Sequence, residues 1–333
     1  MKRLMLSAAA AALLAAPGAA GAADYTFALV PKNVNNPFFD VARDGCKKAE
    51  EELGGKIECL YIGPGEHGGG EEQLQMVNDL ITRQVDGIAV SPSNAAGIVS
   101  ALVQAKEAGI PVLTWDSDLL PENADLRIAY IGTKNYDIGV NLAKLVQEIK
   151  PDGGTICIQS GGAAAANHNE RMQGIRDTLG GMSGTTSPGE RLDGDNGWTE
   201  VDGCPLYTDD DAARAVQQME DILARYPDLD AYISTGAFTQ WNPDAYRNVA
   251  TKVKDRIDSG DLALVVADTL PMQMDLLKEG LSHGQVGQRP FEMGYQTMHF
   301  LLDIVENGKI PEDPTYTGLD VCTPDNADSC IGN

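Results

Sequence analysis

Short apolar runs alternate along the chain with longer stretches in which apolar residues recur every three or four positions. Leu74, Val77, Leu80 and Ile81 have this helical spacing, whereas residues 25–30 form a short apolar run typical of a strand. The first such series predicts strands at 25–30, 56–62, 87–90 and 111–115, with helices at 37–53, 71–84 and 95–108. Strands that alternate with helices at short spacing favour a parallel sheet with helices on both faces.

The same alternation then restarts. It predicts strands at 128–131, 155–159, 231–234 and 263–267, helices at 136–149, 169–179, 211–226, 243–258, 271–279 and 290–306, and an extended tail. Each series is long enough to bury a core of its own. We therefore predict an α/β protein made of two doubly wound parallel-sheet lobes. In such sheets ligands bind beyond the carboxyl ends of the strands, so the polar residues of those loops are the candidates for a site.

Residues 1–22 have the organisation of a secretory signal peptide. Lys2 and Arg3 precede an apolar stretch that is too short for a membrane anchor, and residues 20–22 (Ala-Gly-Ala) fit the small-residue cleavage rule. A buried N-terminal helix is the alternative, but nothing amphipathic supports it. We expect cleavage before Ala23 or Asp24 and export to the periplasm.

Charge and hydropathy exclude two classes of partner. The 333 residues include 25 Lys and Arg against 49 Asp and Glu, a net charge of −24. Because such an acidic surface repels phosphate backbones, we expect no nucleic-acid partner. Beyond residue 30, no apolar run approaches the roughly 20 residues of a membrane span.

The six cysteines suit an exported chain. None belongs to a CxxC pair, which argues against zinc and thioredoxin-like chemistry, and exported proteins favour disulfides. Among the possible pairings we favour the most local set, with free buried thiols as the alternative. That set is Cys46–Cys59, Cys157–Cys204 and Cys322–Cys330.

The sequence contains no complete catalytic or cofactor-binding motif. The sequence has no G-x-S-x-G elbow, HExxH or phosphate-binding G-x-x-x-x-G-K-[ST]. Residues 63–68 match G-x-G-x-x-G, but they follow the second strand and are surrounded by glutamates that would repel a pyrophosphate. Asp193, Asp195 and Asn196 suggest a calcium loop, but the EF-hand frame fails at the next positions, so we interpret them as a solvated loop. We expect no cofactor, no metal and no enzymatic activity.

The strand-end loops instead offer groups that bind polyhydroxylated ligands. Carboxylates and amides hydrogen-bond adjacent hydroxyls, and aromatic faces cover apolar C–H surfaces. For any single residue, an Asx turn or a helix N-cap is the alternative. The candidates are Asn33, Asn35, Asn36, Phe38, Phe39, Asp116, Ser117, Asp118, Asn167, His168, Asn169, Arg171, Asp268 and Gln288.

Several of these stretches resemble a known family. Residues 30–39 (Val-Pro-Lys-Asn-Val-Asn-Asn-Pro-Phe-Phe) resemble the opening of ribose-type periplasmic sugar-binding proteins, as do residues 85–88 and 108–112. Residues 114–118 (Thr-Trp-Asp-Ser-Asp) also resemble the receptors for rhamnose and furanosyl autoinducers. The similarity extends, with decreasing strength, over essentially the whole mature chain.

The resemblance implies a type I periplasmic binding protein, whose two lobes are joined by a hinge of three crossings. It implies a monomer that closes on a monosaccharide or sugar alcohol and delivers it to the permease of an ABC importer, without changing any bond in the ligand. We expect residues 23–132 and 289–313 in the N-terminal lobe, and 133–288 and 314–333 in the C-terminal lobe.

The resemblance also implies ligand contacts in the first lobe. Asn36, Phe38 and Phe39 match its polar and stacking positions. Asp116 matches a carboxylate that binds sugar hydroxyls, although a serine follows it where ribose binders have an arginine. Lys32 matches a ligand-contacting lysine of the autoinducer receptors, with a solvated lysine as the alternative.

In the second lobe the implied contacts lie on three segments. Asn169 falls where ribose-type proteins place a ligand arginine, Arg171 matches the arginine that follows, and Asn167 and His168 occupy polar ligand positions of the autoinducer branch. Asp268 and Gln288 match ligand contacts of the family in the second lobe and at the hinge. The family's Asn-Asp pair is missing around residues 236–241, where Phe238 or Trp241 would supply a stacking face instead.

Other functions compete with import. A signalling or chemotaxis receptor for a furanosyl autoinducer or a sugar would have the same core, and no motif distinguishes it. A LacI-type regulator also has this core, but the signal peptide, the acidic charge and the lack of a helix-turn-helix before Tyr25 argue against it. A lyase or hydrolase would need a paired acid and base, and the sequence shows no such pair.

Overall fold

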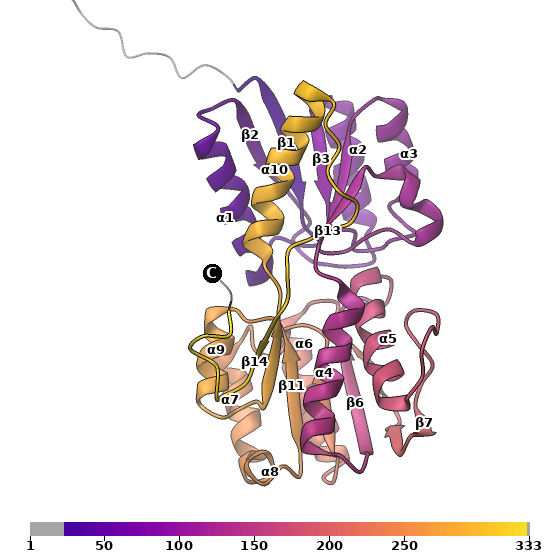
Figure 1. The fold of residues 1–333 in the computed structure, drawn as a ribbon, viewed down its shortest axis with the longest axis vertical. Coiled ribbons are helices and arrows are strands. Elements are labelled where there is room, and N and C mark those ends of the chain that lie inside the picture. Colours follow the sequence, from indigo (N-terminus) through magenta and orange to yellow (C-terminus); the bar gives the residue numbers. More distant parts are fainter. Residues whose placement is uncertain (1–22, 332–333) are drawn as a thin grey trace, which may run out of the picture.

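The computed structural model describes residues 23–331, which form two lobes, each built around one sheet (Figure 1). The predicted signal peptide lies outside the described residues. The six-stranded first sheet has the order β13-β5-β4-β3-β1-β2, and all its pairs are parallel. Its strands are β1 (Tyr25–Val30), β2 (Ile57–Tyr61), β3 (Gly87–Val90), β4 (Val112–Trp115), β5 (Ala129–Gly132) and β13 (Thr315–Tyr316).

Helices cover both faces of the first sheet, as the hydrophobic pattern predicts. Along β1, Phe27 and Leu29 join a core with α1 and α10, whereas Ala28 and Val30 join one with α2 and α3. This division follows from the alternation of side chains along a strand. The helices are α1 (Pro37–Glu52), α2 (Glu71–Thr82), α3 (Val99–Glu107), the 3-10 helix η1 (Pro121–Leu126) and α10 (Pro290–Asn307).

The second sheet has eight strands in the order β14-β12-β11-β10-β6-β8-β7, with β9 also paired to β6. Antiparallel strands occur only at its two edges, where β14 pairs with β12 and β7 with β8. The strands are β6 (Gly154–Ser160), β7 (Asp193–Asp195), β8 (Trp198–Glu200), β9 (Leu206–Tyr207), β10 (Ala231–Ser234), β11 (Ala263–Ala267), β12 (Gly284–Gly287) and β14 (Asp320–Cys322). The helices are α4 (Asn135–Ile149), α5 (Ala166–Gly180), α6 (Ala212–Arg225), α7 (Pro243–Lys252), α8 (Lys254–Ser259) and α9 (Pro271–Lys278).

The chain passes between the lobes after β5, after β12 and after β13 (Figure 1). The predicted lobe boundary at residue 314 is wrong for Thr315 and Tyr316, because these residues pair with β5 in the first sheet. The third crossing therefore follows β13. A two-residue strand carries no apolar run from which the sequence could predict it.

The structure also differs from the predicted elements at several other places. The strands β7, β8, β9, β12 and β14 are too short, too polar or too rich in glycine to give an apolar run. The helix predicted at 243–258 breaks at Val253, whose φ of −116° separates α7 from α8. Helix α5 begins at Ala166, three residues earlier than expected, and α3 begins at Val99, four residues later.

The six cysteines form the three predicted disulfides, and none remains free. The first joins α1 to β2, the second joins β6 to the segment before β9, and the third closes the C-terminal loop. In the part of the chain that the structure describes, no helix combines the length and the apolar character needed to cross a membrane.

Each lobe packs one pair of helices through glycines. In the first lobe, a Cβ added to Gly294 of α10 would lie 1.8 Å from the carbonyl oxygen of Ala42 in α1. In the second lobe, a Cβ at Gly139 of α4 would lie 2.0 Å from the carbonyl oxygen of Arg171 in α5. The close approach of α4 therefore fixes the backbone of Arg171, which lies at the site described below.

We expect Gly294→Ala to lower the free energy of unfolding by about 1–3 kcal/mol, because the added methyl group forces α1 and α10 apart. Urea denaturation followed by circular dichroism measures this change. Gly65→Ala is the matched control, because a Cβ at Gly65 meets nothing within 4 Å. Equal stability of the two variants would contradict the close-packing argument.

Candidate functional site

Polar and aromatic residues from the carboxyl ends of strands in both lobes surround one cavity between the lobes. The position agrees with the rule for doubly wound sheets, in which ligands bind at the strand ends where the order of the sheet reverses. The free space in this cavity is only about 20 Å³, so the two lobes are nearly closed on each other. It is lined by Lys32, Asn36, Phe38, Phe39, Asp116, Asn167, His168, Arg171, Asp210, Gly236, Phe238, Trp241, Asp268 and Gln288.

Asp116, directly after β4, is the centre of a buried polar network. Its Oδ2 lies 3.1 Å from the ammonium nitrogen of Lys32 and accepts a hydrogen bond of 2.7 Å from Ser91. Its Oδ1 accepts a hydrogen bond of 3.2 Å from Asn167 of the second lobe. Lys32 in turn donates to Asn167 Oδ1 at 2.8 Å. The two lobes are thus in direct polar contact across the cavity, and a ligand that enters must replace these bonds.

Arg171 brings a second positive charge to Asp116. Its Nε donates to Asn135 Oδ1 at 2.9 Å and its Nη1 donates to the carbonyl oxygen of Thr235 at 2.8 Å. These bonds orient the guanidinium so that Nη2 lies 3.9 Å from Asp116 Oδ1, without a hydrogen-bond partner among the described residues. Nη2 is therefore a buried donor at the cavity, suited to a ligand oxygen.

Asp268, directly after β11, is the counterpart of Asp116 in the second lobe. It accepts hydrogen bonds from Gln288 Nε2 at 2.7 Å and from the backbone N–H of Ala237 at 3.3 Å. Burial raises the pKa of Asp268, while the charge of Arg171 and the bond from Gln288 oppose the rise. The carboxylate is therefore held in place by neutral donors.

Asp116 and Asp268 share a backbone conformation that most residues avoid. Their φ angles are 59° and 72°, in the left-handed region, which aspartate tolerates better than most side chains. Each donates its backbone N–H to the next strand, to Ile131 at 3.2 Å and to Val286 at 2.7 Å respectively. In both lobes the strand ladder thus continues to the aspartate, and the left-handed turn follows at that residue.

Aromatic rings form the apolar walls of the cavity in both lobes. Phe38 and Phe39 lie edge to face at the start of α1, where Asn36 Oδ1 caps the helix by accepting from the N–H of Phe38 at 2.9 Å. In the second lobe, Trp241 packs edge to face on Phe238 with a centroid distance of 5.3 Å. Rings beside fixed carboxylates are an arrangement that suits a ligand with apolar and hydroxylated faces.

His168 is neutral at this site. Burial, together with the positive charges of Lys32 and Arg171, holds its pKa well below the usual value. Its Nδ1 is hydrogen-bonded to the Thr235 hydroxyl at 3.1 Å, and its Nε2 lies 3.8 Å from Asp210 Oδ1.

The profile of the periplasmic binding protein domain matches residues 27–310. The chain belongs to the periplasmic binding protein family. The resemblance inferred from residues 30–39 is thereby confirmed, and so is the type I two-lobe fold.

Relatives and solved structures agree with this assignment. The D-allose-binding periplasmic protein of Escherichia coli K12 is 23% identical over 303 residues, which cover 90% of this chain and 89% of that protein. The ribose import binding protein of Salmonella typhimurium is 21% identical over 310 residues, 93% of this chain and 95% of that protein. Both relatives are named as sugar-binding proteins, and the second as a protein of ribose import.

A solute-binding protein of an ABC transporter from Burkholderia graminis, solved with D-arabinose, is 30% identical. It superimposes with a TM-score of 0.77 and covers 93% of this chain and 98% of its own. A second, from Agrobacterium vitis with bound D-fucose, has a TM-score of 0.79 at 24% identity and covers 91% and 97% of the two chains. The latter shows the fold alone.

Most of the residues predicted for the ligand site of this periplasmic binding protein come together at the cavity. Asn169 does not, because it is partly exposed and its Nδ2 donates to the carbonyl oxygen of Ala163 at 3.0 Å. Asp118 is bound to Arg127 at 2.6 Å, and Asn35 donates to the carbonyl oxygen of Gly65. Their contacts are structural. Ser91, Asn135 and Asp210 also lie at or behind the cavity, although the sequence pattern did not predict them.

The other sequence motifs form local structure. Within the glycine-rich loop 63–68, His67 is buried against the second lobe, where a Cβ at Gly162 would lie 2.3 Å from its Cε1. The acidic stretch 193–196 forms β7 and the turn before β8, a hairpin exposed at its tip. Among residues 23–331, no group of His, Cys, Asp and Glu has an arrangement that would hold a metal ion.

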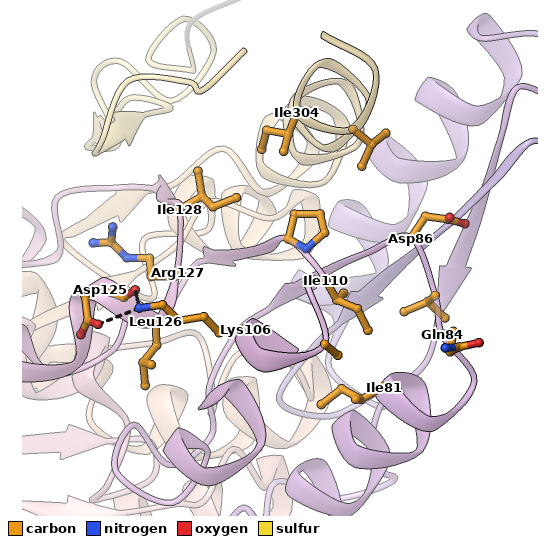
Figure 2. A pocket seen from close by; sticks show the side chains of 15 residues that line it. Ile81, Gln84, Asp86, Lys106, Ile110, Asp125, Leu126, Arg127, Ile128 and Ile304 are labelled. Carbon is orange, nitrogen blue, oxygen red and sulfur yellow. Dashed lines mark hydrogen bonds and ion pairs between the residues drawn. The ribbon is translucent and has the colours of Figure 1, made fainter. Parts of the chain in front are cut away.

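A larger hollow of about 690 Å³ lies in the first lobe at the opposite ends of its strands (Figure 2). It is lined by apolar residues such as Ile81, Ile110 and Ile304, and its charges are satisfied locally. Lys106, for example, binds Asp125 at 2.9 Å on the exposed rim. This hollow is not the ligand site despite its size, because none of the polar residues that line the cavity between the lobes lines it.

Glu170, the neighbour of Arg171 on α5, gives this binding protein a specific pH dependence. Burial and the negative charge of Asp118 raise the pKa of Glu170 from its usual value of 4.5 to about 7, against the opposing charge of Arg171. Between these two values the folded protein retains a proton that the unfolded chain has lost. The associated stability is therefore full below about pH 4.5 and is lost as the pH rises through 7, by up to about 3 kcal/mol.

We expect Glu170→Gln, whose side chain stays neutral, to lose less stability than the wild type as the pH rises from 4.5 to 8. Urea denaturation at a series of pH values from 4.5 to 8 measures the slope. Glu107→Gln, which replaces an exposed glutamate of α3, is the control and should decline as the wild type does. Parallel profiles for all three proteins would contradict the raised pKa.

Proposed function

We propose that this protein is the periplasmic solute-binding subunit of an ABC importer for a monosaccharide or sugar alcohol. One observation carries the proposal: fixed carboxylates from both lobes, Asp116 and Asp268, face one small cavity with aromatic walls. Hydroxyl groups both donate and accept, so a ring of hydroxyls satisfies Asp116 and the free donor of Arg171 together. The sugars named for the relatives, D-allose, ribose and D-arabinose, belong to this class.

The mechanism is closure of the lobes on the ligand. A ligand that touches both lobes stabilises the closed state, because only that state offers the contacts of both Asp116 and Asp268. Lys32 and Asn167, which now bind each other across the lobes, transfer their hydrogen bonds to ligand oxygens. The closed form then presents one combined surface to the permease. The protein acts as a monomer and changes no bond in the ligand.

A thermal-shift screen of the mature protein tests the proposal. The protein is first unfolded, dialysed and refolded, so that no co-purified solute remains. The panel consists of D-ribose, D-arabinose, D-allose, D-galactose, D-fucose, D-tagatose, erythritol, xylitol and myo-inositol. A member at 100 times its dissociation constant should add about 2.7 kcal/mol of stability. No shift with any of them would contradict a sugar- or polyol-binding function.

Asp268→Ala tests whether binding takes place in this cavity. We expect isothermal titration with the best panel member to show affinity weakened by about 2–3 kcal/mol, because charge-assisted hydrogen bonds to the ligand are lost. Asp275→Ala, at an exposed position of α9, is the control and should keep the wild-type affinity. Wild-type affinity in Asp268→Ala would place the ligand elsewhere.

A further inference from the structure

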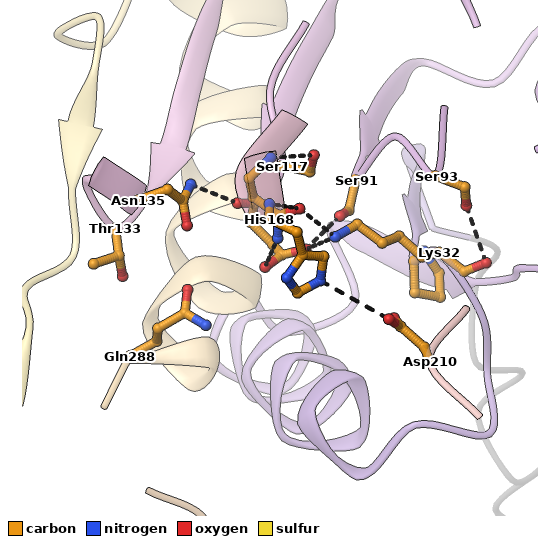
Figure 3. A network of polar contacts seen from close by, with 12 residues as sticks. Lys32, Ser91, Ser93, Ser117, Thr133, Asn135, His168, Asp210 and Gln288 are labelled. Atoms are coloured by element: carbon orange, nitrogen blue, oxygen red, sulfur yellow. Dashed lines mark hydrogen bonds and ion pairs between the residues drawn. The ribbon is translucent and has the colours of Figure 1, made fainter. Parts of the chain in front are cut away.

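Asp210 places a buried carboxylate at the cavity. Its side chain is 2% exposed, and its Oδ1 accepts no hydrogen bond within the described residues. His168 Nε2 lies 3.8 Å from this oxygen, too far for a hydrogen bond (Figure 3). The low pKa of His168 leaves that ring uncharged, so it supplies no counter-ion. Buried carboxylates are normally paired, because an unsatisfied one is strongly destabilising.

The surrounding backbone holds Asp210 in this unfavourable position. Its φ is 56°, and its N–H donates at 3.1 Å to the hydroxyl of Thr208, which is itself fully buried and bonded to the carbonyl oxygen of Ser160 at 3.0 Å. Gly161 supplies the necessary space, since a Cβ there would lie 2.6 Å from Asp210 Oδ1. Strain of this kind persists where the surrounding structure enforces it, often at functional sites.

Trp241 supplies a complementary group beside the same cavity. Its indole Nε1–H is buried and donates to nothing among residues 23–331. Its ring is fixed by the edge-to-face contact with Phe238. Asp210 and Trp241 both line the inner cavity and also a second hollow at the mouth of the cleft, which is bordered by Asn33 and His67 of the first lobe. The two residues therefore stand where the inner cavity meets the mouth.

We propose that Asp210 and Trp241 recognise a hydroxyl group on the outward-facing end of the ligand. A hydroxyl donates to Asp210 Oδ1 and accepts from Trp241 Nε1, so it satisfies both groups. An ammonium group would leave the indole donor unpaired, and a carbonyl oxygen would leave the carboxylate unpaired. The pair thus selects for hydroxyl at this end of the ligand. This inference rests on the proposed function, because it specifies one end of the same binding site.

Two measurements test Asp210. The first is the melting temperature of the refolded, ligand-free protein. Asp210→Asn removes an unpaired buried charge and should raise the melting temperature, as expected for a residue kept for binding at the expense of stability. A fall would indicate a structural residue and would overturn the proposal. Asp209→Asn is the matched control, because Asp209 is the adjacent residue but its carboxylate is paired with Arg214 at 2.5 Å.

The second measurement is isothermal titration with the panel member that gives the largest thermal shift and with its analogues that each lack one hydroxyl. We expect Asp210→Ala to weaken binding of that member by about 10- to 100-fold. One deoxy analogue should bind the wild type more weakly by a similar factor, yet bind Asp210→Ala as well as the parent compound does. Trp241→Phe, which keeps an aromatic ring without the N–H, should lose discrimination at the same hydroxyl.

The outcomes separate this inference from the proposed function. If the wild type binds no panel member, both are overturned. If the wild type binds and Asp268→Ala does not, but Asp210→Ala keeps its affinity within twofold and the same deoxy profile, only the assignment of Asp210 is overturned.

Discussion

Asp116→Ala should lower both the stability of the closed protein and its affinity for ligand, more than any other substitution in the cavity. Lys32 is 1% exposed at its side chain, and Asp116 is the carboxylate that pairs with it, at 3.1 Å. Removing one partner of a buried pair leaves an uncompensated charge and destabilises by about 3–5 kcal/mol. Arg171, 3.9 Å away on the other side, loses the same counter-charge.

Urea denaturation of the ligand-free protein measures the loss of stability, and isothermal titration measures the loss of affinity. Asp116→Asn removes the charge but keeps the shape of the side chain and an acceptor for Ser91. Its stability and affinity should therefore lie between those of Asp116→Ala and those of the wild type. Asp125→Ala removes an exposed partner of Lys106 and should change stability by at most about 1 kcal/mol. If the free energies of unfolding of Asp116→Ala and Asp125→Ala were equal, the charge of Lys32 would be satisfied by another group. Asp116 would then not be the residue that holds the polar network together.

Asp116 and Asp268 could be predicted because each directly follows a buried apolar run. The runs at 111–115 and 263–267 define strands, and the residue after each strand must lie at the carboxyl edge of its sheet. No structure is needed for that inference. The partners that hold these aspartates, such as Ser91 and Gln288, directly follow other strands, and only the sheet order makes them neighbours.

Asn169 and Asp210 show the two ways in which the sequence misleads at this site. Helix α5 turns by about 100° per residue, so Asn167, His168 and Arg171 share the face toward the cavity while Asn169 points away. The family motif places Asn169 by alignment and cannot supply this rotation. Asp210 follows β9, a strand of two residues without an apolar run, so nothing in the pattern marks it as a strand-end residue.

The disulfide Cys157–Cys204 should contribute more stability than either of the others. It closes a loop with a sequence separation of 47, compared with 13 for Cys46–Cys59 and 8 for Cys322–Cys330. In the chain-entropy model, a bridge restricts the unfolded chain more strongly as its loop lengthens. The expected contributions are about 4 kcal/mol for Cys157–Cys204 and about 2.5 kcal/mol for Cys322–Cys330.

Double substitution of each pair by alanine, followed by urea denaturation, measures the two contributions. Cys204 lies shortly before β9 and the turn that carries Asp210, while Cys157 lies within the sheet on β6. Loss of this bridge should therefore also loosen Asp210 and weaken ligand binding, whereas loss of Cys322–Cys330 should affect stability alone. A larger loss of stability for the shorter loop would contradict the entropic account and would indicate that the C-terminal bridge acts through the packing around Met274 and Leu277.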